Sequence, residues 1–470
     1  MGSENLGLKV FMFPWLAYGH ISPFIELAKR LSERNILTYV CSTPVNINSF
    51  KTKIPEKYSN SIQLVELHLP SLPELPPHHH TTNGLPLDLQ PTLRKALKLA
   101  RPNLSNILKT LDPDLLIHDV TYQWAAKFSL SHNIPAISFC TSGATMVSYF
   151  CHVSMKPGTE YPFQAIRLSD FEQEMLYSTM KSYRNEAAEE DPEDKVPPEA
   201  CKIMLMKSSG EIEGKYIDYL SEMIKREIMP VGALFPDPVS HNEENELMEW
   251  LGKKKESSSV FVSFGSEYYL KKEEIEEIAY GLELSNVNFI WVIRFPAGEN
   301  IRVEEALPEG FLKRIGERGR VVEGWAPQTQ ILGHSSIGGF VSHCGWGSMM
   351  ESIEFGVPII AMPMHLDQPL NAKLVVELGV GVEVVRDEKG RLQREEIAKV
   401  IKDLVFGTIG ENLRRKVREQ RENTRLRSQE EMDGVVQKLA QLCGKSSVFF
   451  FSGKLPQTDG GQTCFTVAYN

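Results

Sequence analysis

Polar residues at fixed offsets in the stretch 325–368 have the types that would bind a nucleotide joined to a sugar. The tryptophan that opens the stretch offers a flat face to a pyrimidine ring, and stacking of this kind is worth about 1–3 kcal/mol. The glycine-rich turn HCGWGS, residues 343–348, can bring main-chain N–H groups close to phosphate where a helix starts. Glu351 could accept hydrogen bonds from a ribose diol, and Asp367 and Gln368 would suit the hydroxyl groups of a hexose. The pattern predicts a nucleotide-sugar site.

A histidine near the N-terminus is a second candidate for chemistry. His20 follows Gly19 in the segment PWLAYGHISP, residues 14–23. Gly19 would let the backbone turn tightly, and Ser22 with Pro23 has the pattern of an N-cap and a first helical position. Histidine has an unperturbed pKa of about 6.5, so it keeps a neutral fraction at pH 7 and can act as a general base. Spacing alone leaves two interpretations of His20 open, a general base and a structural cap.

The elements that must position these residues alternate between strands and helices. A first series begins with the apolar run Leu8–Phe13, and a second begins with Val260–Phe264. Strands that alternate with helices predict a doubly wound parallel sheet, in which ligands bind outside the carboxyl ends of the strands. His20 lies in the loop after the first expected strand, and Asp119 follows a later one. A helical pattern covers residues 92–110.

The length of 470 residues predicts more than one domain, because a single hydrophobic core does not grow that large. We expect a first domain over residues 1–235, a connector rich in proline and charge over 236–256, and a second domain over 257–443. The interval 153–200 is polar and acidic, which favours a surface excursion. The tail 444–470 is atypical and has no predicted role.

The stretch 325–368 resembles the signature box of plant family-1 UDP-sugar glycosyltransferases. It has the motifs WAPQ, HCGWGS, Glu351, GVP and DQ in the family's order and spacing. The resemblance covers about residues 8–443. It implies an α/β fold of the GT-B type, with two facing doubly wound, Rossmann-like parallel-sheet domains and a cleft between them. The N-terminal domain would bind the acceptor and the C-terminal domain the UDP-sugar.

The resemblance also implies roles for individual residues. His20 stands in the family's G-H-x-x-P setting and would remove the proton from the acceptor hydroxyl. Asp119, with Trp124 five residues later, matches the family's carboxylate, which would fix the histidine tautomer and stabilise the imidazolium. Twelve positions would contact the donor: Ser266, Trp325, Ala326, Gln328, His343, Trp346, Gly347, Ser348, Glu351, Asp367, Gln368 and, near the transferred sugar, Thr141.

The implied reaction is a direct displacement at the anomeric carbon of an α-linked UDP-sugar, which gives a β-glycoside. UDP would leave with its charge spread by His343, Ser348 and main-chain N–H groups. We expect UDP-glucose as a co-substrate, with no cofactor and no metal ion. The run His78–His80 is not expected to bind metal, because adjacent residues of an extended segment cannot all face one ion.

Some positions depart from the common pattern of the family. Position 347 is Gly where the family usually has Asn, so main-chain contacts to phosphate remain while a side-chain amide is missing. This position, with FPWLAYGHISPF and VSFGSEYYL, resembles the branch that adds sugar to sugar. Gln368 resembles the glucose-using members. The sequence therefore predicts an inverting UDP-glucose-dependent glucosyltransferase that extends the sugar of a small-molecule glycoside, such as a terpenoid or flavonoid.

Composition limits the partners and the compartment. The net charge of −10 argues against a nucleic-acid partner. Seven cysteines without a C-x-x-C pair are typical of reduced thiols in a cytosol. No apolar run reaches the roughly 18–20 residues of a membrane-spanning helix. We expect a cytoplasmic monomer without stable membrane insertion, whose partners are a UDP-sugar donor and a small-molecule glycoside acceptor.

Three alternatives compete with this prediction. An aglycone O-glucosyltransferase of a flavonoid or terpenoid stays open, because acceptor-pocket geometry does not follow from the sequence. A non-catalytic UDP-sugar-binding protein would lack the base or its carboxylate, and both His20 and Asp119 are present. An NAD-dependent oxidoreductase would need G-x-G-x-x-G after a strand, and the glycine pair at 379–381 lacks the third glycine.

Overall fold

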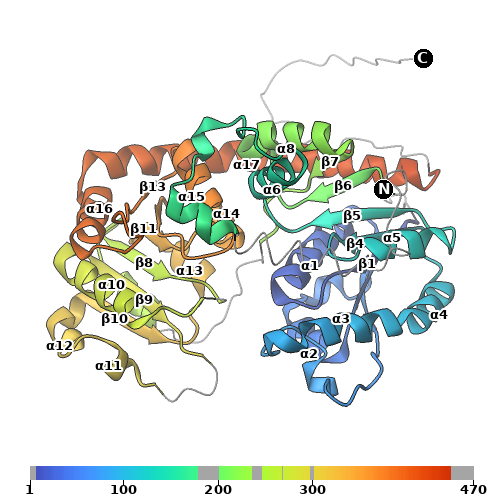
Figure 1. Ribbon diagram of the computed structural model, residues 1–470, viewed down its shortest axis with the longest axis horizontal. Helices are drawn as coiled ribbons and strands as arrows, with labels where there is room; N and C mark the ends of the chain where they lie inside the picture. The colour runs from blue at the N-terminus through green and yellow to red at the C-terminus, as the bar shows by residue number, and fades with distance from the viewer. Residues whose placement is uncertain (1–6, 178–200, 236–245, 267, 297–300, 446–470) are drawn as a thin grey trace, which may run out of the picture.

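Two α/β domains make up the computed structural model, which describes residues 7–177, 201–235, 246–266, 268–296 and 301–445 (Figure 1). The described strands of the first domain form a seven-stranded sheet in the order β3-β2-β1-β4-β5-β6-β7. Those of the second form a six-stranded sheet in the order β10-β9-β8-β11-β12-β13. Neighbouring strands pair in parallel throughout both sheets. The expected pair of doubly wound parallel sheets is confirmed.

The first sheet is built from short, mostly buried apolar strands, as expected where helices cover both faces. Its strands are β1 Lys9–Phe13, β2 Leu37–Ser42, β3 Ile62–Glu66, β4 Leu115–Asp119, β5 Ala136–Cys140, β6 Ile203–Met206 and β7 Glu227–Pro230. The α-helices of this domain are α1 Tyr18–Ser32, α2 Pro44–Phe50, α3 Gln90–Leu99, α4 Arg101–Leu111, α5 Gln123–Leu130, α6 Ala144–Met155 and α8 Gly210–Ile224.

The second domain repeats the same alternation. Its strands are β8 Ser259–Ser263, β9 Asn288–Ile293, β10 Gly319–Glu323, β11 Ile337–Ser342, β12 Ile359–Ala361 and β13 Gly381–Glu383. The helices that precede, connect and follow them are α9 Glu246–Gly252, α10 Lys272–Ser285, α11 Val303–Ala306, α12 Phe311–Ile315, α13 Gln328–Leu332, α14 Trp346–Phe355, α15 Gln368–Glu377, α16 Arg394–Phe406 and α17 Thr408–Leu442.

Each sheet reverses its strand order at one place. In the first sheet the chain runs outward from β1 to β3 and then returns to place β4 on the other side of β1. In the second sheet it runs outward from β8 to β10 and returns at β11. Loops that leave neighbouring strands at such a switch point diverge and leave a crevice for ligands. The candidate residues should therefore gather at the carboxyl ends of β1 and β4, and of β8 and β11.

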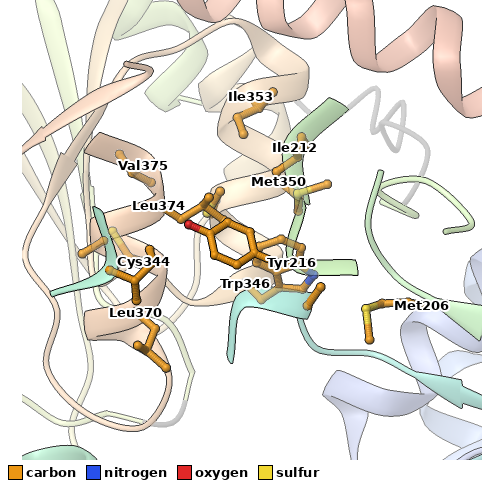
Figure 2. Packing of buried hydrophobic residues seen from close by; sticks show 14 of the residues in the cluster. Met206, Ile212, Tyr216, Cys344, Trp346, Met350, Ile353, Leu370, Leu374 and Val375 are labelled. Atoms are coloured by element: carbon orange, nitrogen blue, oxygen red, sulfur yellow. The ribbon is translucent and has the colours of Figure 1, made fainter. Parts of the chain in front are cut away.

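The domains share a hydrophobic core and a long bridging helix. Trp346 of the second domain lies in one buried cluster with Met206, Ile212 and Tyr216 of the first (Figure 2). Helix α17 runs along both domains, from its start beside α16 to its end near β7 (Figure 1). Its last turns pack into the core of the first domain, through Met432, Val435, Val436 and Leu439. The two sheets are thus held against each other by packing, in addition to the chain connection.

Two local expectations about the start of the first helix are wrong. Helix α1 begins at Tyr18 and not after Ser22, because the carbonyl of Ala17 already accepts the N–H groups of His20 and Ile21 at 3.0 and 2.9 Å. Pro23 consequently lies inside the helix, and Gly19 occupies its first turn without a positive φ. The helical pattern expected near 92–110 is confirmed and is formed by two helices, α3 and α4, with Pro102 in the first turn of the second.

Two loop expectations also need correction. Residues 163–177 are not a surface excursion, since Leu168 and Leu176 are buried and Glu172 pairs with Lys373 of the second domain at 2.9 Å. The rest of the expected excursion, residues 178–200, lies outside the described residues, as does most of the tail 444–470. The histidine run is not extended, because Pro77–His79 forms a 3₁₀ turn.

Candidate active site

His20 and Asp119 meet at the switch point of the first sheet. His20 stands in the first turn of α1, directly after β1, and Asp119 is the last residue of β4 rather than the residue after it. Since β1 and β4 are neighbours, the two side chains meet, with His20 Nδ1 2.8 Å from Asp119 Oδ2. Asp119 is 0% exposed, whereas the histidine ring is partly exposed. The pair has the geometry of a base and its orienting carboxylate.

The carboxylate of Asp119 is held by groups besides the histidine. Thr121 donates its main-chain N–H and its hydroxyl to Oδ1, at 3.0 and 2.9 Å. The main-chain N–H of Trp15 lies 3.4 Å from Oδ2. Burial by itself raises the pKa of Asp119, but the charge of His20 and the hydrogen bonds from His20 and Thr121 together keep it below its ordinary value. Asp119 therefore stays ionised at neutral pH although it is buried.

Thr141 brings a hydroxyl to the same pair from the end of β5. Its Oγ1 lies 3.4 Å from His20 Nδ1. Two residues further on, a Cβ added to Gly143 would come within 2.9 Å of the indole ring of Trp346. The loop 141–143 thus contacts the base on one side and the HCGWGS turn on the other. This loop brings the two switch points together across the domain interface.

The WAPQ residues lie after β10 and continue into α13. The side chain of Trp325 is 77% exposed, so its ring is open for stacking, whereas Ala326 is buried beneath it. Gln328 Nε2 donates to Glu351 Oε2 at 2.7 Å and to Ser348 Oγ at 3.2 Å. Burial raises the pKa of Glu351, while Gln328 and the charge of Lys207 act in the opposite direction. The structure therefore brings together three of the predicted donor residues.

The HCGWGS turn follows β11, next to the end of β8, and leads into α14. Its His343 ring packs against two glycines, since a Cβ on Gly265 or on Gly345 would come within 2.5 Å of His343 Nε2. Burial, with a further contribution from His365, lowers the pKa of His343 to about 4. His343 is therefore neutral at pH 7 and can act there only as a hydrogen-bonding group. Ser266, the residue after Gly265, is exposed.

The last two positions of the box start helix α15. Gln368 Oε1 accepts the main-chain N–H groups of Met364 and His365, at 2.9 and 3.0 Å, and its Nε2 lies 2.8 Å from His365 Nδ1. The amide is therefore engaged mainly with its own loop. Asn371 Nδ2 donates to Asp367 Oδ2 at 2.9 Å and to the carbonyl of Cys344, so it fixes the aspartate relative to the HCGWGS turn.

Three residues that support this site do not stand out from the sequence pattern. Thr121 could have been found as a hydroxyl two residues after the carboxylate, a spacing typical of local turns. Asn371 could have been suspected from its place one helical turn after Asp367. Lys207 gave no signal, because its place beside the box follows only from the packing of two domains.

The described residues can also be compared with the requirements of a metal site and of a membrane-spanning helix. Among the described residues, no group of three or more His, Cys, Asp or Glu side chains is placed to hold a metal ion. In the same part of the chain, no helix is both long and apolar enough to span a bilayer.

Comparison with known families agrees with the geometry. Residues 7–236 match the model described as the N-terminal domain of a glycosyltransferase, and residues 228–414 match UDP-glucoronosyl and UDP-glucosyl transferase. The beta-D-glucosyl crocetin beta-1,6-glucosyltransferase of Gardenia jasminoides is 58% identical over 92% of this chain and 98% of its own. The chain is a UDP-glycosyltransferase of this family.

Two more similarities extend over nearly the whole transferase. The UDP-glucosyltransferase 29 of Panax ginseng is 50% identical over 95% of this chain and 99% of its own. A solved structure of Phytolacca americana UGT2, complexed with UDP-2fluoro-glucose and pterostilbene, has a TM-score of 0.73 and 25% identity. It covers 93% of this chain and 100% of that one. The expected GT-B arrangement of the transferase is confirmed.

Proposed function

We propose that this enzyme transfers glucose from UDP-glucose to a hydroxyl group on the sugar of a small-molecule glycoside and forms a β-linkage by inversion. The observation that carries the proposal is the His20–Asp119 hydrogen bond, placed beside the loop 141–143 that reaches Trp346. A base and a donor box that meet across one interface suit a displacement between two bound substrates. The names of the Gardenia jasminoides and Panax ginseng relatives support glucose as the sugar transferred.

In the proposed mechanism His20 acts as the general base. Asp119 accepts the Nδ1–H hydrogen bond, so the other ring nitrogen, Nε2, is the basic one. As the acceptor oxygen bonds to the anomeric carbon, its proton moves to Nε2, and the bond from that carbon to the phosphate oxygen breaks. The electron pair leaves with UDP. Asp119 then stabilises the imidazolium, which is the role that its buried negative charge suits.

The donor would be held by the residues of the box. The ring of Trp325 would stack on uracil, and Glu351, oriented by Gln328, would accept hydrogen bonds from the ribose. Main-chain N–H groups at the start of α14 would bind the diphosphate, with Ser348 and Ser266 beside them. Asp367 would face the glucose hydroxyls, and Gln368 would do so by exchanging hydrogen bonds that its amide makes to its own loop. The proposed displacement uses no metal ion, so a chelator should leave the initial rate unchanged.

We also propose that the acceptor is already a glycoside and that the enzyme works as a cytoplasmic monomer without a nucleic-acid partner. The Gardenia jasminoides relative is named for a substrate that carries a glucosyl group, which supports a sugar hydroxyl as the acceptor. The net charge of −10 argues against a nucleic-acid partner. The absence of a C-x-x-C pair supports the compartment.

An acceptor panel tests the proposal. Bare aglycones and their glucosides, terpenoid and flavonoid, are incubated with UDP-glucose, UDP-galactose or UDP-xylose, and the products are read by mass and linkage analysis. We expect extension of the glucosides, and kcat/KM at least about tenfold lower with UDP-galactose, which corresponds to about 1.4 kcal/mol. Products formed only from bare aglycones would support the alternative, an aglycone O-glucosyltransferase. Equal use of glucose and galactose would contradict the donor assignment.

A further inference from the structure

A buried lysine of the first domain reaches the donor box of the second. Lys207 directly follows β6, and its main-chain N–H and carbonyl groups both form hydrogen bonds. Its N–H donates to the carbonyl of Cys140 at 2.9 Å, and its carbonyl accepts the indole N–H of Trp346 at 2.8 Å. The residue is 8% exposed. Its Nζ lies 3.9 Å from the position that a Cβ would take at Gly347.

The ammonium of Lys207 has no hydrogen-bonded or ion-paired partner among the described residues. Burial lowers the pKa of Lys207, and the charges of the Glu351 and Glu26 carboxylates oppose that shift. Both are engaged elsewhere, since Glu351 accepts from Gln328 at 2.7 Å and Glu26 pairs with Lys29 at 2.8 Å. A buried charge without a bonded partner is costly. An anion that enters beside Nζ would offset that cost.

The neighbourhood of Nζ is suited to an anion. Gly347 is the second residue of α14, whose first turn is capped by no side chain and presents main-chain N–H groups. His343, the other side chain expected at the diphosphate, has its pKa lowered to about 4 by burial and brings no positive charge at pH 7. A glycine at 347 leaves the space between Nζ and the helix start open. An asparagine side chain there would lie in that space.

We infer that Lys207 is a donor-binding residue that contacts the diphosphate of the UDP-sugar and takes the place of the side-chain amide missing at Gly347. The inference rests on the proposed use of a UDP-sugar. It also makes the donor a ligand of both domains, because Lys207 belongs to the first and α14 to the second. Charge-assisted contacts of this kind are short and about twice as strong as neutral ones.

Binding of UDP and of uridine to Lys207→Met, measured by calorimetry at one ionic strength, tests the inference. Uridine keeps the contacts to Trp325 and Glu351 but lacks phosphate. We expect UDP affinity to fall about tenfold or more, as for other hydrogen bonds to charged groups, and uridine affinity to change less than about twofold. Equal losses for both ligands would mean that Lys207 acts only through Glu351, and would overturn the inference. No loss for either ligand would overturn it as well.

Matched variants distinguish a lost contact to the diphosphate from a general effect of removing a lysine. Lys202→Met removes an exposed lysine five residues earlier and should change neither affinity. Gly347→Asn added to Lys207→Met should recover part of the UDP affinity, since it restores the family's usual amide. If Lys207→Met does not fold, the wild-type structure with UDP decides, and a distance beyond about 4 Å from Nζ to every phosphate oxygen overturns the contact. A wild-type protein that binds neither ligand would instead contradict the proposed function.

Discussion

The two halves of the active site differ in how far the protein prepares them by itself. In the first domain, Asp119 and Thr141 each already lie within hydrogen-bonding distance of His20. In the second domain, Trp325 is largely exposed and Ser266 is exposed as well. The base half is thus oriented by protein groups alone, whereas the tryptophan expected to stack on uracil faces solvent.

This difference follows from what each half must do. A general base needs one tautomer and one orientation, and a buried carboxylate with fixed donors supplies both. A stacking surface needs only a flat face, and its binding free energy arises when the ligand covers it. Substitutions in the base half should therefore change the rate and leave donor affinity intact. Substitutions in the stacking surface should do the reverse.

Replacement of His20 by alanine should have the largest effect. Removal of a general base typically costs about 10²–10⁴-fold in rate, so kcat/KM should fall within that range while the Kd for UDP changes less than about twofold. Rates are measured at saturating donor and UDP binding by calorimetry. His334→Ala is a suitable control, because His334 precedes β11 at the amino edge of the second sheet, away from the site. More than about half the wild-type rate would rule out His20 as the base.

Asp119→Asn should have the next largest effect, a loss of about 10²-fold in rate. The amide keeps the size of the side chain and can still accept from Thr121, but it cannot stabilise an imidazolium. Thr121→Val, which removes only the 2.9 Å hydroxyl contact to Oδ1, should cost a few-fold at most. Single-turnover rates of the Asp119→Asn and Thr121→Val variants measure both effects. Unchanged turnover in Asp119→Asn would leave His20 acting alone.

Trp325→Ala, in the donor-binding half, should weaken UDP binding and leave the chemical step nearly unchanged. Loss of base stacking, about 1–3 kcal/mol, should raise the Kd for UDP by about 5- to 150-fold, with kcat at saturating UDP-glucose within about threefold of wild type. Trp325→Phe keeps an aromatic face and should lose less. Equilibrium binding and initial rates on the same preparations give both quantities. A large loss in kcat with normal UDP binding would show that the tryptophan serves the chemical step.

The sequence predicted the parts of this site that depend on local pattern. Apolar runs of strand length, alternating with helical periodicity, indicated the two parallel sheets. Of the motif residues singled out from the sequence, Ser348 and Glu351 lie within hydrogen-bonding distance of Gln328 in the structure. Local pattern failed at the start of α1. There, main-chain hydrogen bonds to the carbonyl of Ala17 outweigh the N-cap pattern of Ser22 and Pro23.

Other features could not be predicted because they arise between distant segments. Lys207 follows β6 of the first sheet, whereas Gly347 follows β11 of the second. No spacing rule relates two residues so far apart in the sequence. The contact of Thr141 with His20 depends on the register of β5 beside β4. The return of α17 to the first domain depends on which core its apolar residues fill. All three are consequences of tertiary packing.

The last expected effect concerns acid stability instead of activity and compares one buried histidine in each domain. Burial lowers the pKa of both His118 and His343 to about 4. Because these pKa values lie below that of an unfolded histidine, the unfolded chain takes up protons first as the pH falls. Stability is therefore complete above about pH 6.5 and is lost down to about pH 4, at about 2–3 kcal/mol per histidine by pH 4.5.

His118→Asn should flatten this acid-induced decline, because its ring, which bonds only to the carbonyl of Asp119 among the described residues, no longer titrates. The measurement is the free energy of unfolding, or the Tm, between pH 7 and 4.5. Where the two domains unfold separately, a signal specific to each domain is recorded. His343→Asn should flatten the decline of the second domain in the same way. A decline as steep in both buried-site variants as in the wild type would mean that these histidines accept protons in the folded protein near pH 6.5. His343 would then carry charge at the diphosphate, and the need for a cation from Lys207 would be smaller.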